Sequence, residues 1–253
     1  MLRPRIIPCL LYHKKGLYKT FRFGTGKYIG DPLNAVRIFN EKNVDELIFI
    51  DIDATVAGLI PDYNLIKDLA NECHMPLCYG GGIKNVEQVE KVISLGVEKV
   101  AISSAAIKRP ELIKEAAVRV GSQSVVVGID VLRRESLSGI KLEVFTHNGT
   151  IATGLDAAEF ARMAQDMGAG EILINSIDRD GTMEGYDLEL VDRIRSKLSI
   201  PITVLGGAGK VEDIKILVNR YGLIGAAAGS LFLFKGKFKA VLIQYVDESA
   251  RTK

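Results

Sequence analysis

The sequence predicts a single (β/α)₈ barrel, a TIM barrel, that spans residues 1–253. Eight short apolar runs alternate with eight amphipathic stretches, and no linker separates them. The apolar runs are continuous, which is typical of parallel strands that are buried on both faces. A length of 253 residues also matches the roughly 250 residues that one such barrel requires. The alternative that this pattern leaves open is a doubly wound parallel sheet.

The predicted strands are short runs rich in β-branched and other apolar residues, and most are followed by a glycine or a polar residue. In chain order they cover residues 6–10, 47–51, 77–79, 100–103, 124–130, 172–175, 202–205 and 223–228.

The predicted helices lie between these strands and begin at capping residues or first-turn prolines, as at Asp31-Pro32, Asn85 and Arg109-Pro110. In chain order they cover residues 32–42, 62–73, 86–95, 110–120, 157–167, 188–198, 211–220 and 235–246.

Two segments interrupt the strand–helix alternation. Residues 133–154 contain no helical pattern, and Asn148-Gly149 lies between two strand-like runs, which predicts a β-hairpin inserted after strand five. The segment after strand one, residues 12–30, is predicted to be a long loop rich in glycine, lysine and aromatic residues. In a barrel both segments belong to the C-terminal face, where active sites lie.

An internal repeat relates the two halves of the chain. Gly80 and Gly206 follow predicted strands three and seven, and Ser104 and Ser230 follow predicted strands four and eight. The two glycines are separated by the same number of residues as the two serines. This constant spacing predicts a duplicated half-barrel. Glycines let backbone N–H groups approach an anion closely, so each half is predicted to hold one phosphate with its serine. The alternative is that these glycines only form tight turns.

Acidic residues follow several strands at the predicted C-terminal face. Asp130 ends strand five, Asp51 ends strand two, and Asp178 and Asp180 follow strand six. A carboxyl group at the end of a barrel strand can exchange a proton with a bound ligand. We predict that role for Asp130, whereas a hydrogen bond within the loop is the expected role of Asp178.

Four strands begin with a charged residue at the opposite, N-terminal face. Two bases and two acids could form a closed ring across the floor of the barrel, although spacing alone favours simple solvation of the strand starts. The four residues are Arg5, Glu46, Lys99 and Glu171.

Composition excludes several classes of protein. A net charge of +2 is too balanced for an electrostatic nucleic-acid binder. The apolar runs are shorter than the roughly 20 residues of a membrane span, and no signal peptide is predicted. Sparse cysteines predict a reducing cytoplasm without disulfides, and scattered histidines predict no metal site. The cysteines are Cys9, Cys73 and Cys78, and the histidines are His13, His74 and His147.

Four strings of residues resemble the cyclase subunit of imidazole glycerol phosphate synthase, and the similarity extends over essentially the whole chain. They are Arg5-Ile-Ile-Pro-Cys-Leu10, Gly80-Gly-Gly-Ile83, Ser176-Ile-Asp-Arg-Asp-Gly-Thr182 and Gly206-Gly-Ala-Gly-Lys210. The resemblance implies a (β/α)₈ barrel without a cofactor. It also implies a glutaminase subunit on the N-terminal face, whose ammonia passes through the barrel to a ribulosyl-phosphate ligand at the C-terminal face.

The same resemblance implies roles for individual residues. Arg5, Glu46, Lys99 and Glu171 match an ammonia gate, which reverses the expectation of simple solvation. Asp130 matches one of two catalytic aspartates. The positions that match substrate or phosphate binding are Lys19, Gly82, Ser103, Ser104, Asp180, Gly181, Gly206, Gly207, Gly229 and Ser230.

The chain departs from that family at Leu11, where the second catalytic aspartate is expected. Asn175 and Leu205 also stand where Thr and Ser are usual. A subgroup with this Leu-Leu ending of strand one is associated with amidation of bacterial surface sugars, together with a glutaminase and a separate sugar amidotransferase. The resemblance therefore implies an ammonia-using synthase subunit with altered chemistry. The alternatives are a non-catalytic ammonia conduit that activates the glutaminase, a true histidine-pathway cyclase, and a lone sugar-phosphate isomerase.

Overall fold

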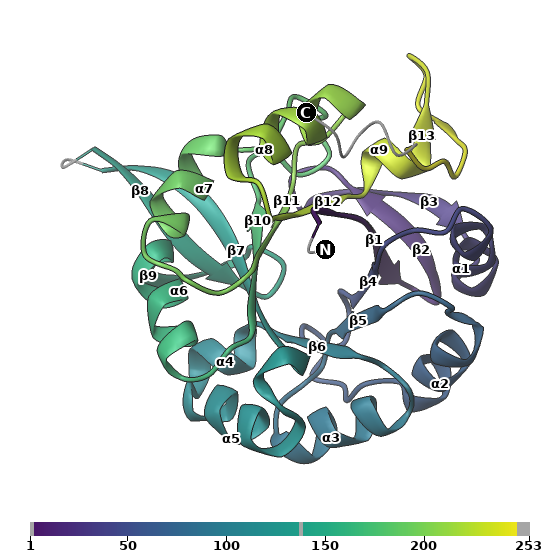
Figure 1. The fold of residues 1–253 in the computed structure, drawn as a ribbon. Helices are drawn as coiled ribbons and strands as arrows, with labels where there is room; N and C mark the ends of the chain where they lie inside the picture. Colours follow the sequence, from purple (N-terminus) through teal and green to yellow (C-terminus); the bar gives the residue numbers. More distant parts are fainter. Residues whose placement is uncertain (1–2, 137–138, 247–253) are drawn as a thin grey trace.

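Eight parallel strands close into a barrel in the computed structural model, which describes residues 3–136 and 139–246 (Figure 1). The last of them pairs in parallel with the first, with Arg5 opposite Gly225, and this closure excludes the doubly wound sheet. In order around the barrel the strands are β1 (Arg5–His13), β4 (Leu47–Asp51), β5 (Leu77–Gly80), β6 (Lys99–Ile102), β7 (Val125–Ser136), β10 (Glu171–Ser176), β11 (Ile202–Leu205) and β12 (Gly225–Ala228).

The helices form a ring outside the strands (Figure 1). Two of the three predicted helix starts have the expected cap, since Asp31 accepts a hydrogen bond from the Asn34 N–H and Asn85 accepts one from the Gln88 N–H. At the third, Pro110 precedes the first helical residue, Glu111, and no side chain caps the helix. The helices are α1 (Pro32–Glu41), α2 (Tyr63–Glu72), α3 (Val86–Ser94), α4 (Ser104–Lys108), α5 (Glu111–Val120), α6 (Ala157–Asp166), α7 (Leu188–Arg195), α8 (Val211–Tyr221) and α9 (Ser230–Leu233), with a 3₁₀ turn at Ser122–Ser124.

The predicted helix over residues 235–246 is wrong. This segment contains an antiparallel pair of short strands, β13 (Phe234–Lys235) and β14 (Ala240–Val241). The turn between them is closed by a 3.0 Å hydrogen bond from the Lys239 N–H to the Gly236 carbonyl. Gly236 has φ = +72° and Lys239 has φ = +49°, and neither value is compatible with a right-handed helix.

Both predicted interruptions of the alternation are antiparallel extensions of barrel strands. β2 (Gly16–Thr20) and β3 (Gly26–Gly30) continue from β1, so the segment after strand one is a sheet extension rather than an irregular loop. β8 (Gly139–Thr146) and β9 (Ile151–Asp156) continue from β7, as the hairpin prediction required, although residues 137 and 138 lie outside the described part. The first strand of each half therefore carries the same kind of extension, which agrees with the predicted repeat.

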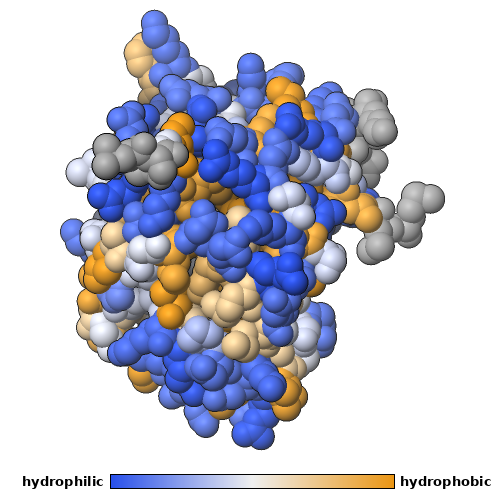
Figure 2. Space-filling model, turned by 90° about the vertical axis from the view of Figure 1, so that its left-hand side faces the viewer, coloured by the Kyte–Doolittle hydropathy of each residue, from blue (hydrophilic) through white to orange (hydrophobic). Residues whose placement is uncertain are grey.

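Apolar residues form two separate layers. A large layer lies between the strands and the helices, and a smaller one fills the inside of the barrel. No helix among the described residues is long and apolar enough to cross a bilayer. The side of the molecule shown in Figure 2 presents mainly hydrophilic side chains with smaller hydrophobic patches between them. The inner layer consists of Ile7, Cys9, Ile48, Cys78, Ala101, Val126, Leu173, Leu205 and Ala227.

Candidate functional site

A cavity of about 1110 Å³ opens at the carboxyl ends of the barrel strands. Its lower wall reaches into the barrel as far as Cys9, Ala101 and Leu173, which belong to the inner apolar layer. Most of the residues predicted from the sequence to bind substrate lie on its wall. Those residues are Lys19, Gly82, Ser103, Ser104, Asp180 and Gly229, and Asp130, the predicted catalytic residue, lies on the same wall.

Asp130 lies inside this cavity at the end of the barrel section of β7. Its Oδ1 accepts a 3.1 Å hydrogen bond from Nδ2 of Asn175 on the neighbouring strand β10. Removal from bulk water raises the pKa of Asp130 to about 7, an effect that the hydrogen bond from Asn175 opposes and the negative charge of Asp180 increases. A carboxyl group with this pKa can donate or accept a proton at neutral pH.

Asn175 presents a further polar atom near Asp130. Its Oδ1 is buried and finds no hydrogen-bond partner among the described residues. A buried polar group without a partner costs roughly 1–3 kcal/mol, so this oxygen is suited to accept a hydrogen bond from a bound ligand. Gly206 lies next to this oxygen, and only glycine fits at position 206 because a Cβ there would lie 2.7 Å from the carbonyl oxygen of Ser176.

Leu11 faces the cavity from β1, on the opposite side of the barrel from Asp130. β1 and β7 are four strands apart in the ring of eight, in whichever direction the strands are followed. Leu11 and Ile50 pack against the inner apolar layer, of which Leu205 is a member. This wall of the cavity is therefore apolar where the resemblance implies a carboxylate.

The two predicted phosphate loops occupy different parts of the site. Gly82, Ser103 and Ser104 line the main cavity. The residues of the second predicted phosphate site follow β10, β11 and β12 and line a much smaller adjoining hollow of about 10 Å³. They are Gly181, Gly206, Gly207, Gly229 and Ser230.

Lys19 explains why the second hollow is small. Its side chain is buried, and its Nζ lies 2.5 Å from Oδ1 of Asp180. The side chain runs past Gly229, where an added Cβ would come within 3.0 Å of it. Thr20 also donates a hydrogen bond to Asp180 at 2.8 Å. The structure thus brings Lys19 and Asp180 together on the wall that the main cavity and the second hollow share.

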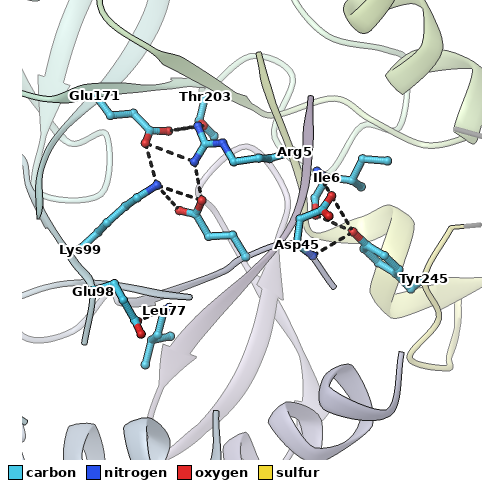
Figure 3. Close-up of polar contacts among 10 residues, drawn as sticks. Arg5, Ile6, Asp45, Leu77, Glu98, Lys99, Glu171, Thr203 and Tyr245 are labelled. Carbon is cyan, nitrogen blue, oxygen red and sulfur yellow. Dashed lines mark hydrogen bonds and ion pairs between the residues drawn. The ribbon is translucent and has the colours of Figure 1, made fainter. Parts of the chain in front are cut away.

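The four charged residues at the strand starts form a closed ring at the N-terminal end of the barrel (Figure 3). Lys99 Nζ lies 2.9 Å from carboxylate oxygens of both Glu46 and Glu171. Arg5 Nη2 lies 2.8 Å from Glu171, and Nη1 of Arg5 bonds Glu46. Each glutamate therefore has two cationic partners, Arg5 and Lys99. Both glutamates are buried. Thr203, which the sequence did not single out, donates its hydroxyl to Glu171.

The ring predicts how stability depends on pH. Burial alone would raise the pKa of Glu171, but Arg5 and Lys99 outweigh it and hold this pKa below its ordinary value of 4.5. Glu171 therefore stabilises the fold fully above about pH 4.5, and this contribution is lost as pH falls through the folded-state pKa. We expect urea unfolding to show that loss at acidic pH. Glu171→Gln should lack this component of the pH dependence, and identical pH profiles for the two proteins would contradict the argument.

Two other acidic residues serve the loops that carry them. Oδ1 of Asp51 accepts hydrogen bonds from the N–H groups of Asp53 and Ala54, at 2.9 and 3.0 Å. Asp178 accepts a 2.9 Å hydrogen bond from the N–H of Arg133, so it has the predicted hydrogen-bonding role, but the donor lies on β7 and not within the loop.

Sequence reasoning missed a histidine–aspartate pair on the cavity wall. Nδ1 of His13 lies 2.6 Å from Oδ1 of Asp53, and both residues line the cavity. The available signal was position, because each residue closely follows the apolar part of a barrel strand. Among the described residues, no three His, Cys, Asp or Glu side chains are grouped in a way that would hold a metal ion.

Comparisons with known proteins point to one family. The sequence profile described as histidine biosynthesis protein matches residues 5–239. A Vibrio vulnificus protein, named provisionally as imidazole glycerol phosphate synthase subunit hisF3, is 56% identical over 100% of this chain and 96% of its own length. A Pseudomonas aeruginosa protein, named provisionally as subunit hisF2, is 50% identical over 98% and 97% of the two chains. The Clostridium botulinum imidazole glycerol phosphate synthase subunit HisF is 40% identical over 93% and 92%.

Proposed function

The chain belongs to the histidine biosynthesis protein family, as a cyclase subunit of the imidazole glycerol phosphate synthase type, and on that premise we propose that it is the ammonia-using subunit of a glutamine amidotransferase. A glutaminase subunit docks on the N-terminal face and releases ammonia there. The ammonia passes through the barrel and reacts with a phosphate-bearing ligand in the cavity at the C-terminal face.

One observation carries this proposal, which is the order of features along the barrel. A ring of paired charges occupies the N-terminal end, the interior is apolar, and a large cavity with Asp130 on its wall occupies the C-terminal end. Uncharged ammonia crosses an apolar interior at little cost, whereas ammonium would lose its hydration. A sugar-phosphate isomerase that acts alone has no use for such a floor, so we rank that alternative last.

We further propose that the chemistry at the C-terminal face differs from that of the histidine pathway. Leu11 cannot exchange a proton, and general acid–base catalysis by one group contributes about 10²–10⁴-fold. The apolar wall around Leu11 supports a different acceptor, and we favour amidation of a bacterial surface sugar in concert with a separate sugar amidotransferase. In this proposal Lys19 and the glycine–serine loops hold the phosphates of the ligand, and Asp130 is the acid–base group.

The test uses free ammonium in place of a glutaminase. The purified barrel receives saturating ammonium and the ribulosyl-formimino ribotide of the histidine pathway, next to an authentic cyclase subunit under the same conditions. We expect this chain to turn over the ribotide at least about 100-fold more slowly than the control, because Leu11 has no ionisable group that could exchange a proton with the ligand. Turnover close to that of the control would show instead that the chain is a histidine-pathway cyclase.

A second measurement separates the synthase from a passive conduit. Pull-down from an extract of the source organism is expected to recover a glutaminase subunit, which glutamine hydrolysis then identifies. Failure to recover one would favour the isomerase alternative. A glutaminase that the barrel activates, with no product formed on any acceptor by the barrel itself, would favour the conduit.

A further inference from the structure

His13 and Asp53 form a pair with the geometry of an acid–base dyad at the mouth of the cavity. Oδ1 of Asp53 lies 2.6 Å from Nδ1 of His13, and Oδ2 of Asp53 accepts a 2.9 Å hydrogen bond from the N–H of Lys14. Both carboxylate oxygens are therefore engaged and the carboxylate is fixed. A carboxylate at Nδ1 keeps a proton on that nitrogen and leaves the lone pair of Nε2 available.

The fold holds the imidazole ring in place on several sides. His13 is the last residue of β1 and is paired with Gly16 of β2 across a tight turn, in which Lys14 and Lys15 have φ values of +47° and +61°. The ring of Tyr18 meets the imidazole edge-on, with centroids 4.9 Å apart. In the described part of the chain, Nε2 of His13 has no hydrogen-bond partner.

The position of this pair relates it to the missing aspartate. Cys9, Leu11 and His13 alternate along β1 and all line the cavity, whereas Leu10 between them packs in the outer layer. His13 is therefore one pleat above Leu11 on the same face of the strand, about 6–7 Å nearer the mouth. Since β1 is opposite β7, His13 and Asp130 lie on opposite walls of one cavity.

We propose that the His13–Asp53 pair is the second acid–base group of this subunit, acting on a carbonyl-bearing ligand opposite Asp130. The proposal rests on the proposed ammonia-using function and deepens it. Because the new group lies nearer the mouth than Leu11, it serves a ligand whose reacting carbon is also held higher in the cavity.

The proton balance assigns a role to each group. When the lone pair of ammonia bonds to a carbonyl carbon, the carbonyl π electrons move to oxygen, the oxygen gains a proton and the nitrogen loses one. Asp130 in its protonated form donates to the oxygen, and Nε2 of His13 accepts from the nitrogen. Asp53 stays ionised and stabilises the imidazolium. One proton has passed from nitrogen to oxygen, and exchange with solvent restores both groups.

The first arm of the test needs no ligand. Diethyl pyrocarbonate acylates unprotonated imidazole, and mass spectrometry follows each of the 3 histidines separately. We expect His13 to react faster than His147, which also lines the cavity but has the hydroxyl of Thr146 at its Nδ1. Asp53→Asn should slow His13 at least about 10-fold and leave His147 unchanged. Equal reactivity of the two histidines, or no effect of Asp53→Asn, would overturn the proposal.

The second arm measures turnover with ammonium and the ribulosyl-formimino ribotide. His13→Gln, with its fold checked by circular dichroism, should lower the wild-type rate about 100-fold. Free imidazole should restore part of the rate of His13→Ala, a gain that a purely structural role would not produce. An unchanged rate in His13→Gln would overturn the proposal. Absence of ribotide turnover by the wild-type protein, with a fast-reacting His13, would agree with the different acceptor of the proposed function, and the first arm would then decide on the pair.

Discussion

Asp130→Asn is expected to reduce ammonium-dependent product formation by about 10²–10⁴-fold. Asparagine has nearly the shape of aspartic acid and still accepts the hydrogen bond from Asn175, so the fold and the cavity should persist. It cannot gain or lose a proton in the required range, whereas Asp130 does so because burial raises its pKa to about 7. The measurement is kcat with saturating ammonium, using the acceptor that the wild-type protein turns over.

A matched carboxylate outside the cavity provides the control. Asp178→Asn retains an oxygen that can accept from the Arg133 N–H, and it should keep close to wild-type activity. Wild-type rates in Asp130→Asn would show that Asp130 is not the acid–base group of the synthase. A loss of comparable size in both variants would instead trace the effect to the stability of the C-terminal loops.

The sequence was sufficient to predict the barrel. Its eight continuous apolar runs indicated parallel strands that are buried on both faces, and seven of the eight predicted helices are present between them. The last predicted helix failed for a local reason. Residues 235–246 carry helix-compatible apolar spacing, but Gly236 and Lys239 adopt left-handed backbone conformations that only the folded chain reveals. Amphipathic spacing over a short segment does not distinguish a helix from a hairpin. In this hairpin Phe234 is buried, whereas Phe238 and Val241 are exposed.

The candidate site was predictable where position along a strand determines the location of a side chain. Arg5 and Glu171 meet although they are 166 residues apart, because barrel strands start at the same face. Lys19 was predicted near a phosphate, but its burial against Asp180 depends on the β2–β3 extension, which the sequence pattern did not indicate. The pairing of His13 with Asp53 likewise requires the alignment of β1 with β4, which spacing alone does not determine.

Removal of one cation from the ring should lower the stability of the fold and should also reduce the passage of ammonia through the barrel floor. Lys99→Met leaves two buried glutamates with Arg5 as their only cationic partner in the ring. Breaking a buried ion pair on one side costs roughly 3–5 kcal/mol, and the partial exposure of Lys99 favours the lower end of this range. We expect the free energy of unfolding, measured in urea, to fall by about 3 kcal/mol. With the glutaminase bound, product formed from glutamine should fall relative to product formed from free ammonium.

The ratio of these two activities distinguishes a gate from a structural clamp. Free ammonium can enter the cavity from the C-terminal side, so a defect in the ring alone leaves the ammonium-dependent rate unchanged, whereas a general loss of folding lowers both rates equally. The double variant Lys99→Met/Glu46→Gln pairs one anion with one cation and should regain part of the lost stability through coupling of about 0.5–3 kcal/mol. If stability recovers in the double variant while the glutamine-dependent rate stays low, the arrangement of charges at the floor controls ammonia entry. If both recover together, or if the ratio never changes, the ring holds the barrel closed and plays no part in the transfer.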